Sequence, residues 1–347
     1  LTETTADVFL AQGVKCARCH DHKFDPLLQK DYYRLQAFFA PFHPTEAKPV
    51  ADLATLAAFA ERQQAWEQAT ADLRRRLDAI ERPLLFQHAK GQQPKMFPPE
   101  IQTMIAKRPE DRTPYEHQIA TLAARQFTFQ PEKLEEHLDE AAAAERKQLL
   151  GQLAAYDSLK PKPLPVQAFV AGDVGPQAPL TRIPDDRTKT PIDPGFLTLL
   201  DADAAVIEPP PAALASTGRR TALARWIASE ENPLTARVIV NRVWQQHFGR
   251  GLSASASDFG HLGQAPTHPE LLDWLASWFI REGWSLKKLH RLILTSATFR
   301  QTSARDPDEQ ITSIDPENKL LWRVKPRRLS GEEITDTITA TAGRISI

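Results

Sequence analysis

Hydrophobic residues recur every seven positions along residues 51–85, with charged residues between them. The recurring residues are Phe59, Trp66, Leu73 and Ile80. This spacing predicts one long amphipathic helix. A second such run, 131–156, begins on a proline that suits a first helical turn. We expect the two runs to pair as an antiparallel helical hairpin, joined by a proline-rich segment and a short helix at residues 115–127.

The residue pattern changes at residues 160–211, where prolines are frequent. One short apolar run in this region, Val166–Val170, predicts a strand. The prolines on either side are typical of a linker or a small extended layer.

Helical signals return after Ser216. Asn232 is expected to cap a helix that ends at Gly249 or Gly251. Three further helix starts are predicted from capping residues: Thr267 with Glu270, Ser285, and Ser330 with Glu333. We expect a compact all-α domain whose core holds most of the local tryptophans: Trp226, Trp244, Trp274, Trp278 and Trp284.

The expected fold is therefore mainly α with little β structure. By sequence order we divide the chain into a motif segment (1–50), a helical hairpin (51–158), a proline-rich linker with a short strand (159–215) and an all-α C-terminal domain (216–347). At 347 residues the chain is long enough for two or three domains that each bury a core.

Composition narrows the possible functions. Hydrophobic residues make up 41% of the chain and charged residues 25%, as in folded globular proteins. The formal net charge of -1 gives no reason to expect nucleic acid as a partner. No apolar run approaches the roughly 18 to 20 residues that span a bilayer, and the first residues lack the basic stretch of a signal peptide. Because the chain begins without Met, we expect a fragment or processed form.

The segment VKCARCHDHKFDPLLQKDYY, residues 14–33, holds both cysteines of the chain. Its pentapeptide CARCH has the C-x-x-C-H spacing at which two thiols add to the vinyl groups of a haem and the next histidine ligates the iron. Cysteines this close in sequence close too small a loop to staple a domain as a disulfide. We therefore predict haem c bound covalently through Cys16 and Cys19, with His20 on the iron.

Two other uses of the cluster stay open. The first is a metal ion such as zinc, with ligands drawn from Cys16, Cys19, His20, His22 and a carboxylate such as Asp25. Zinc ribbons usually bring a second ligand pair from far away in sequence, and the chain has no second cysteine pair. The second use is a redox dithiol, or two inert thiols.

A haem iron also needs a sixth ligand or an open site. Met96 lies in a proline-flanked loop that resembles a methionine-delivering loop, and the other candidates are Met104, His43 and His88. Each of these residues is more often a packing residue than a ligand. The polar residues that follow the motif, from Asp21 to Asp25, either lie in solvent or orient His20.

Several long segments together resemble a known family. They are CARCHDHKFDPLLQKDYYRLQAFFA, ENPLTARVIVNRVWQQHFGRGL, DFGHLG, THPELLDWLASWFIREGWSLKKLHRLILTSATFRQTS and DPENKLLWR. Over most of its length the chain is similar to planctomycete-type cytochrome-c-like proteins that pair the domains of unknown function fifteen forty-nine (here its C-terminal part) and fifteen fifty-three. The resemblance implies an exported protein of the periplasm or cell envelope, and it names no substrate or reaction.

The C-terminal motif of this family offers a candidate active site. Four residues are spaced to line one polar stripe of a helix: Asn241, Arg242, Gln245 and His247. Asp258 with His268 would supply an acid and a base. The simpler interpretation, which we favour, is that Arg242 and Asp258 form a buried ion pair, because no nucleophile, phosphate loop or metal-ligand cluster accompanies them.

These observations predict a c-type cytochrome-like envelope protein that passes electrons to a redox partner protein. One alternative is an envelope enzyme, acting for example on polysaccharide, with catalytic groups around His247, Asp258 and His268. Another is an interaction scaffold with a structural metal ion at the Cys/His cluster.

Overall fold

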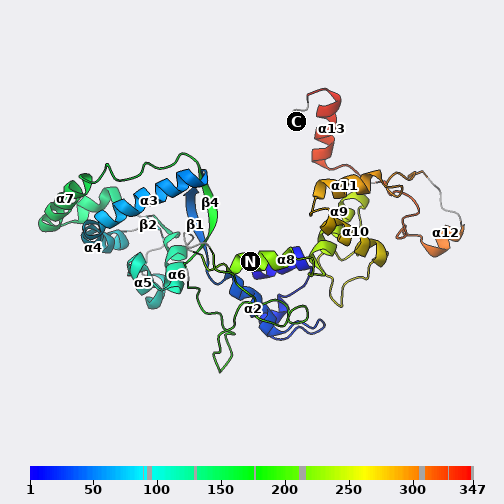
Figure 1. The fold of residues 1–347 in the computed structure, drawn as a ribbon, viewed down its shortest axis with the longest axis horizontal. Helices are drawn as coiled ribbons and strands as arrows, with labels where there is room; N and C mark the ends of the chain where they lie inside the picture. Colours follow the sequence, from blue (N-terminus) through cyan, green and yellow to red (C-terminus); the bar gives the residue numbers. More distant parts are fainter. Residues whose placement is uncertain are drawn as a thin grey trace. The chain divides into compact units, whose positions relative to one another are not determined.

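The computed structural model describes residues 1–88, 90–91, 96–128, 131–175, 177–210, 216–304, 309–326 and 328–344. Helices dominate these residues, whose strands form two small two-stranded sheets (Figure 1). The predicted mainly α fold is therefore confirmed.

Backbone contacts divide the chain into two compact units. Unit 1 comprises Leu1–Phe38, Arg182–Val206 and Arg219–Ile347, and unit 2 comprises Phe39–Thr181 and Ile207–Gly218. These units do not follow the segments that we divided by sequence order. The N-terminal residues and part of the proline-rich linker belong to the same unit as the C-terminal helices.

The helical part of unit 2 begins with α3 (Leu53–Ala69) and α4 (Ala71–Gln87). The prediction of one continuous helix over residues 51–85 is wrong at Thr70, which has φ −109° and ψ 5°. Its hydroxyl donates to the carbonyl of Trp66 at 2.7 Å. A threonine that bonds back to the carbonyl four residues earlier tends to bend a helix, and here the chain restarts as a second helix.

α4 packs against α7 (Glu140–Ala154). Arg146 pairs with Glu81 at 2.7 Å, and the ring of His88 stacks on that of His137 with 3.5 Å between centroids. From the first contact to the second, the residue number rises from Glu81 to His88 on one segment and falls from Arg146 to His137 on the other. The two segments are therefore antiparallel. The predicted helical hairpin is confirmed for α4 and α7.

Short elements fill the connection between the two arms of the hairpin. The predicted short helix is confirmed as α6 (Pro114–Ala124), which begins with a capping box between Thr113 and Glu116. A further helix, α5 (Pro99–Ala106), occupies the segment that we expected to be a connection. The remaining elements are the 3-10 helices η4 (Pro109–Asp111) and η5 (Pro131–His137) and the paired strands β2 (Lys90–Gly91) and β3 (Phe127–Thr128).

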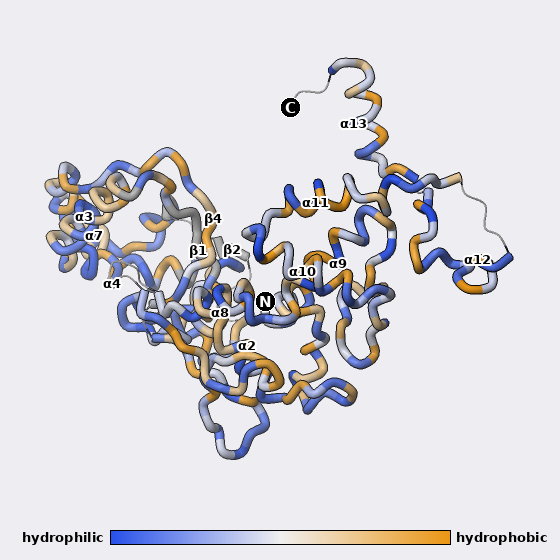
Figure 2. The backbone as a smooth tube through the Cα atoms, turned by 45° about the vertical axis from the view of Figure 1, so that its right-hand side comes forward, coloured by the Kyte–Doolittle hydropathy of each residue, from blue (hydrophilic) through white to orange (hydrophobic). Residues whose placement is uncertain are grey.

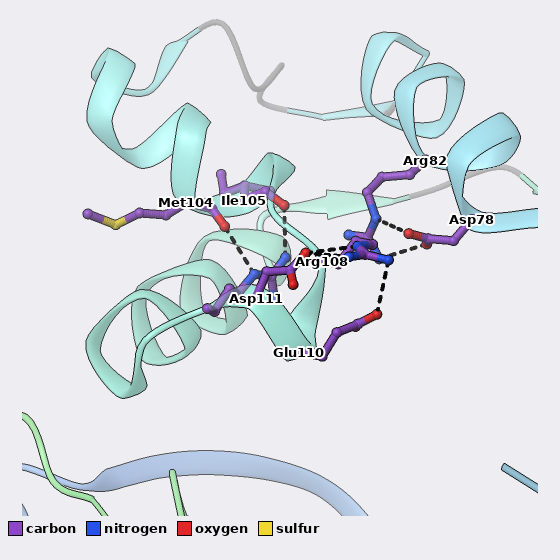
Figure 3. Close-up of polar contacts among 8 residues, drawn as sticks. Asp78, Arg82, Met104, Ile105, Arg108, Glu110 and Asp111 are labelled. Carbon is purple, nitrogen blue, oxygen red and sulfur yellow. Dashed lines mark hydrogen bonds and ion pairs between the residues drawn. The ribbon is translucent and has the colours of Figure 1, made fainter. Parts of the chain in front are cut away.

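Arginines make several of the polar contacts between these short elements, among them the pair of Arg82 with Asp78 (Figure 3). Arg82 donates two bonds of 2.8 Å to Asp78 one turn earlier in α4. Arg112 donates to the carbonyls of Met104 and Ile105 at 3.0 and 2.8 Å, and so satisfies carbonyls at the end of α5. Burial, followed by the nearby charge of Arg82, lowers the pKa of Arg112.

The sheet of unit 2 joins β1 (Phe42–Pro49) to β4 (Gln167–Asp173) in antiparallel register. The strand predicted at Val166–Val170 is confirmed as part of β4. Its partner was not expected, because the β1 sequence FHPTEAKP contains two prolines and no apolar run. The Asp173 side chain then accepts from the backbone amide and the hydroxyl of Thr217 at 3.1 and 2.9 Å.

A histidine of unit 2 makes stability depend on pH. The ring of His117 lies 5.4 Å from that of His43, and burial, followed by the charges of His43 and Arg112, lowers the pKa of His117 below its ordinary value of 6.5. Below about pH 6.5 the unfolded chain binds more protons at this site than the folded chain, so the free energy of unfolding falls as the pH falls. We expect His117→Gln to reduce this fall in urea unfolding measured on both sides of that pH. His261→Gln, which changes an exposed side chain, is the control, and equal pH dependence in all three proteins would refute the prediction.

Unit 1 has an N-terminal and a C-terminal group of helices. The first group is α1 (Thr2–Thr5), the π-helical turn η1 (Ala6–Leu10), the 3-10 turn η2 (Cys16–Arg18) and α2 (Gln29–Phe39). The second is α8 (Arg219–Ile227), α9 (Thr235–Phe248), α10 (Pro269–Arg281), α11 (Leu286–Thr295), α12 (Glu309–Ile314) and α13 (Gly331–Thr341). Nowhere in the described part of the chain is a helix both long enough and apolar enough to cross a bilayer.

The C-terminal core lies among α9, α10 and α11, where hydrophobic and hydrophilic positions alternate along the helices (Figure 2). Trp244 is buried in it, and Trp278 and Trp284 pack against it. Trp274 contradicts the prediction, because it lies on the outer face of α10 with 49% of its surface exposed.

Most of the predicted helix ends of this domain are confirmed. Gly249 ends α9 with φ 78°, and the Ser285 and Ser330 side chains accept from the third backbone amide of their helices. The capping box predicted at Thr267 is wrong. Its hydroxyl bonds to the carbonyl of Leu252 and to His268 instead, so it ties the start of α10 to the preceding loop.

A buried polar cluster joins α2 to the proline-rich region and explains why residues 182–206 belong to unit 1. Asp31 is 1% exposed and accepts from the amide of Thr198 at 3.0 Å. Arg34 is 5% exposed and donates to the hydroxyl of Thr198 at 3.1 Å and to the carbonyls of Asp201 and Asp203.

Candidate functional site

The C-x-x-C-H segment folds as the short 3-10 turn η2, where the amide of Cys19 donates to the carbonyl of Cys16 at 3.4 Å. Side chains three residues apart eclipse in a 3-10 turn, so the two thiols share one side. Both thiols are free and exposed, whereas Ala17 between them is fully buried. The turn is therefore anchored by its alanine and presents its cysteines outward.

His20 is oriented by the residue that follows it. Its Nδ1 lies 2.7 Å from the carbonyl oxygen of Asp21. Because a carbonyl only accepts, Nδ1 carries the proton and Nε2 keeps its lone pair. The carboxylate of Asp21 accepts from the amide of Gln29 at 2.7 Å, which places a negative charge at the start of α2. Asp21 is thus fixed at both its carbonyl and its side chain.

Tyr33 of α2 is hydrogen-bonded to the motif turn. Its hydroxyl donates to the carbonyl of Arg18 at 3.0 Å, and the side chain of Gln29 donates to the same oxygen at 3.4 Å. Burial raises the pKa of Tyr33, so the phenol remains a donor at neutral pH. Our sequence reasoning missed this tyrosine, although it lies in α2 only 13 positions after His20.

His22 and Asp25 connect the motif to the C-terminal helices. His22 Nδ1 accepts from the amide of Asp25 at 2.9 Å and lies 3.2 Å from its carboxylate. The shorter contact makes Nδ1 an acceptor, which leaves the ring proton on Nε2. The Asp25 carboxylate accepts from the amide of His261 at 2.5 Å. A Cβ on Gly260 would stand 2.6 Å from both carboxylate oxygens, so only glycine fits there without displacement.

A cavity of about 460 Å³ opens between the motif and the DFG loop, residues 258–262. Its walls include Cys16, His20, Lys23, Phe24, Asp258 and Leu262. Phe24 and Leu262 are 48% and 62% exposed, so apolar surface borders the opening. Cavities for small molecules and cofactors commonly enclose roughly 300–1,000 Å³ with apolar walls and a few polar groups.

The N-terminal residues are held by Arg242 of α9. Its guanidinium donates to the carbonyls of Asp7 and Val8 at 2.7 and 2.5 Å and to that of Ala256 at 3.2 Å. The interpretation of Arg242 and Asp258 as a buried ion pair is therefore wrong, since the carboxylate of Asp258 accepts from the amide of Gly260. Arg242 instead satisfies carbonyls at the end of η1.

Two family models match the chain. Residues 219–347 match PSD1, a protein of unknown function (DUF1553), and residues 1–43 match PSCyt2, a protein of unknown function (DUF1549). The chain joins a PSCyt2 segment to a PSD1 domain. These two matches confirm the pairing of the two domains of unknown function that the sequence motifs indicate. Comparisons with curated proteins and with solved structures find no match.

Both family segments build the cavity. The PSCyt2 segment contributes the wall from Gly13 to Asp25, and the PSD1 domain contributes Ser257, Asp258 and Leu262. The amide of Phe259 also donates to the carbonyl of Ala11 at 2.8 Å. The DFG loop of the PSD1 domain is therefore bonded to the PSCyt2 segment on both sides of the C-x-x-C-H turn.

The other residues named for the PSD1 domain lie in different places. Asn241 is fully buried and exchanges two 2.9 Å bonds with the backbone of Ser253. His247 bonds to His290 on α11 at 2.8 Å, and His268 bonds to Thr267 at the start of α10. The residues suggested for catalysis are His247, Asp258 and His268. Asp258 is the only one of them among the described residues that line the cavity beside Cys16.

The described residues do not support a metal site built from three or more side chains. Among the described residues, no three His, Cys, Asp or Glu side chains gather in a way that would hold a metal ion. The candidates for a sixth haem ligand all belong to unit 2: Met96, Met104, His43 and His88. The sixth ligand therefore stays a prediction.

Proposed function

We propose that the chain is a c-type cytochrome-like protein of the periplasm or cell envelope that transfers electrons to a redox partner protein. Cys16 and Cys19 would bind haem covalently, and His20 would ligate its iron. The orientation of His20 carries the proposal. An axial histidine is held by a hydrogen bond from Nδ1 so that Nε2 faces the metal, and the 2.7 Å contact with Asp21 supports that state.

Side chains of the motif turn and of the cavity suit a haem, and of the two cysteines Cys16 is the one among the described lining residues of the cavity. The two free thiols share one side of the turn, as covalent attachment requires. Phe24 and Leu262 provide exposed apolar surface for a macrocycle, and Lys23 provides a cation for its carboxylates. When bound, the haem would accept and release one electron, while Cys16, Cys19 and His20 would hold it. The family name PSCyt2 suggests a cytochrome-like context and names no reaction.

A structural zinc ion is supported less well. His22 accepts from the amide of Asp25 through Nδ1 and carries its proton on Nε2. Ligation through Nε2 would require that proton to move to Nδ1, which would break the bond from the amide of Asp25. His22 and Asp25 instead serve to join the motif to the DFG loop.

Haem attachment tests the proposal in a host that exports the chain and matures c-type cytochromes. We expect intact-mass spectrometry to show one covalent haem on the wild type and none on the Cys16→Ser/Cys19→Ser double variant. His20→Gln should abolish the native haem spectrum. His22→Gln is the matched control, and it should preserve the spectrum because Nδ1 of His22 is an acceptor from a backbone amide.

Two outcomes of these measurements would contradict the proposal or one of its assignments. An exported, folded chain without haem would reject it, and stoichiometric zinc in elemental analysis would put a structural metal ion in its place. Loss of the haem spectrum in His22→Gln but not in His20→Gln would reject the assignment of His20.

A further inference from the structure

A second cavity, of about 400 Å³, lies in the PSD1 domain beside the segment DPENKLLWR. It shares none of its described lining residues with the cavity at Cys16. On one side it is lined by Trp244 and Phe248, whose rings stack with 4.2 Å between centroids and 19° between planes. Leu252 and Leu321 extend this apolar wall.

Positive charge dominates the rest of the lining. The described lining residues include four cationic side chains and a single anionic one: Arg250, Lys319, Arg323 and Lys325 against Glu317. Lys319 and Arg250 both approach the Glu317 carboxylate, at 3.0 and 3.6 Å. One carboxylate therefore faces several cations in a chain whose overall formal charge is -1.

One nitrogen of the Arg250 guanidinium donates no hydrogen bond to the described residues. Its terminal nitrogens contact Glu317 and the side chain of Gln264, whereas its buried Nε has no hydrogen-bond partner among the described residues. Buried polar nitrogens are normally paired, so this donor points to a missing acceptor. A ligand oxygen bound in the cavity would supply one.

The loop that carries Lys319 is held in place by side-chain hydrogen bonds to its backbone. The Asp315 carboxylate accepts from the amides of Lys319 and Leu320 at 2.8 and 2.7 Å. Leu321, which lines the cavity, has φ 60°, a left-handed conformation that a leucine rarely adopts. Strained residues of this kind persist where surrounding contacts hold them, and they concentrate at ligand sites.

We propose that this cavity binds a small organic anion in which a sulfate or phosphate is attached to a ring. The cations would pair with the anionic group. The apolar wall around Trp244 would pack against the ring. This site is independent of haem binding and uses none of the residues assigned to it.

Isothermal titration calorimetry of the full chain tests the proposal with phenyl phosphate and phenyl sulfate as probes. We expect both to bind, inorganic phosphate to bind more weakly, and the neutral phenyl β-glucoside not to bind. Preference between the two anionic probes would identify the anionic group. Binding should weaken as sodium chloride is added, because salt screens the charges.

Variants locate the site. Lys325 is exposed and its side chain has no bonded partner among the described residues, so Lys325→Gln should leave the fold intact and weaken binding about tenfold. Arg250→Gln should weaken it by at least as much. Lys288→Gln on α11, where Lys288 pairs with Glu282, is the control and should bind as the wild type does. Wild-type affinity in both cavity variants, equal binding of the glucoside, or no heat with either anionic probe would overturn the proposal.

Discussion

Gly260→Ala is expected to lower the free energy of unfolding by about 1–3 kcal/mol, the usual cost of forcing a methyl group into filled space. The added Cβ would stand 2.6 Å from both oxygens of the Asp25 carboxylate. That carboxylate also accepts from the amide of His261, so it moves only by losing the bond. Urea unfolding measures the change, with Gly331→Ala as control because nothing lies within 4 Å of a Cβ there.

The physical cause can be isolated with a double-mutant cycle. Asp25→Ala removes the carboxylate with which the new methyl group overlaps, so Gly260→Ala should cost much less in that background than in the wild type. Additive costs would show that the overlap is not what makes glycine necessary.

Arg34→Met should destabilise unit 1 by about 1–3 kcal/mol, because it removes a buried guanidinium that donates to several part-buried acceptors. The acceptors are the Thr198 hydroxyl and the carbonyls of Asp201 and Asp203. Lys288→Met is the surface control, and its exposed ion pair with Glu282 should change stability by less than about 1 kcal/mol.

A second substitution distinguishes lost bonds from a general packing defect. Gly195 lies against the guanidinium of Arg34, so Gly195→Ala should be costly in the wild type and nearly neutral once Arg34 is replaced. If Arg34→Met unfolds as the wild type does, the cluster does not hold residues 182–206 to α2.

Local signals in the sequence predicted local structure well. Ser285, Ser330 and Gly249 act at helix ends where their own side chain or backbone freedom decides the conformation. The C-x-x-C-H motif is also recognisable locally, although Tyr33 and Gln29 of α2 help to hold its turn. Thr267 fails as a capping residue because a distant carbonyl, that of Leu252, takes its hydroxyl.

The parts that sequence reasoning missed depend on contacts between distant positions. Asp25 meets the amide of His261, and Arg242 meets the carbonyls of Asp7 and Val8, each across more than 200 positions. Nothing in the periodicity of either segment reports such a bond. For the same reason Arg242 was assigned to Asp258, a nearby acid of opposite charge, when backbone carbonyls of the N-terminal turn are its acceptors.

The most direct test of the proposed function is the visible absorption spectrum of the exported chain, oxidised and then reduced with dithionite. Our account predicts a haem spectrum that changes reversibly on reduction, survives denaturation because the link to Cys16 and Cys19 is covalent, and is lost when both cysteines are replaced. A folded, exported chain with no haem absorbance would contradict it.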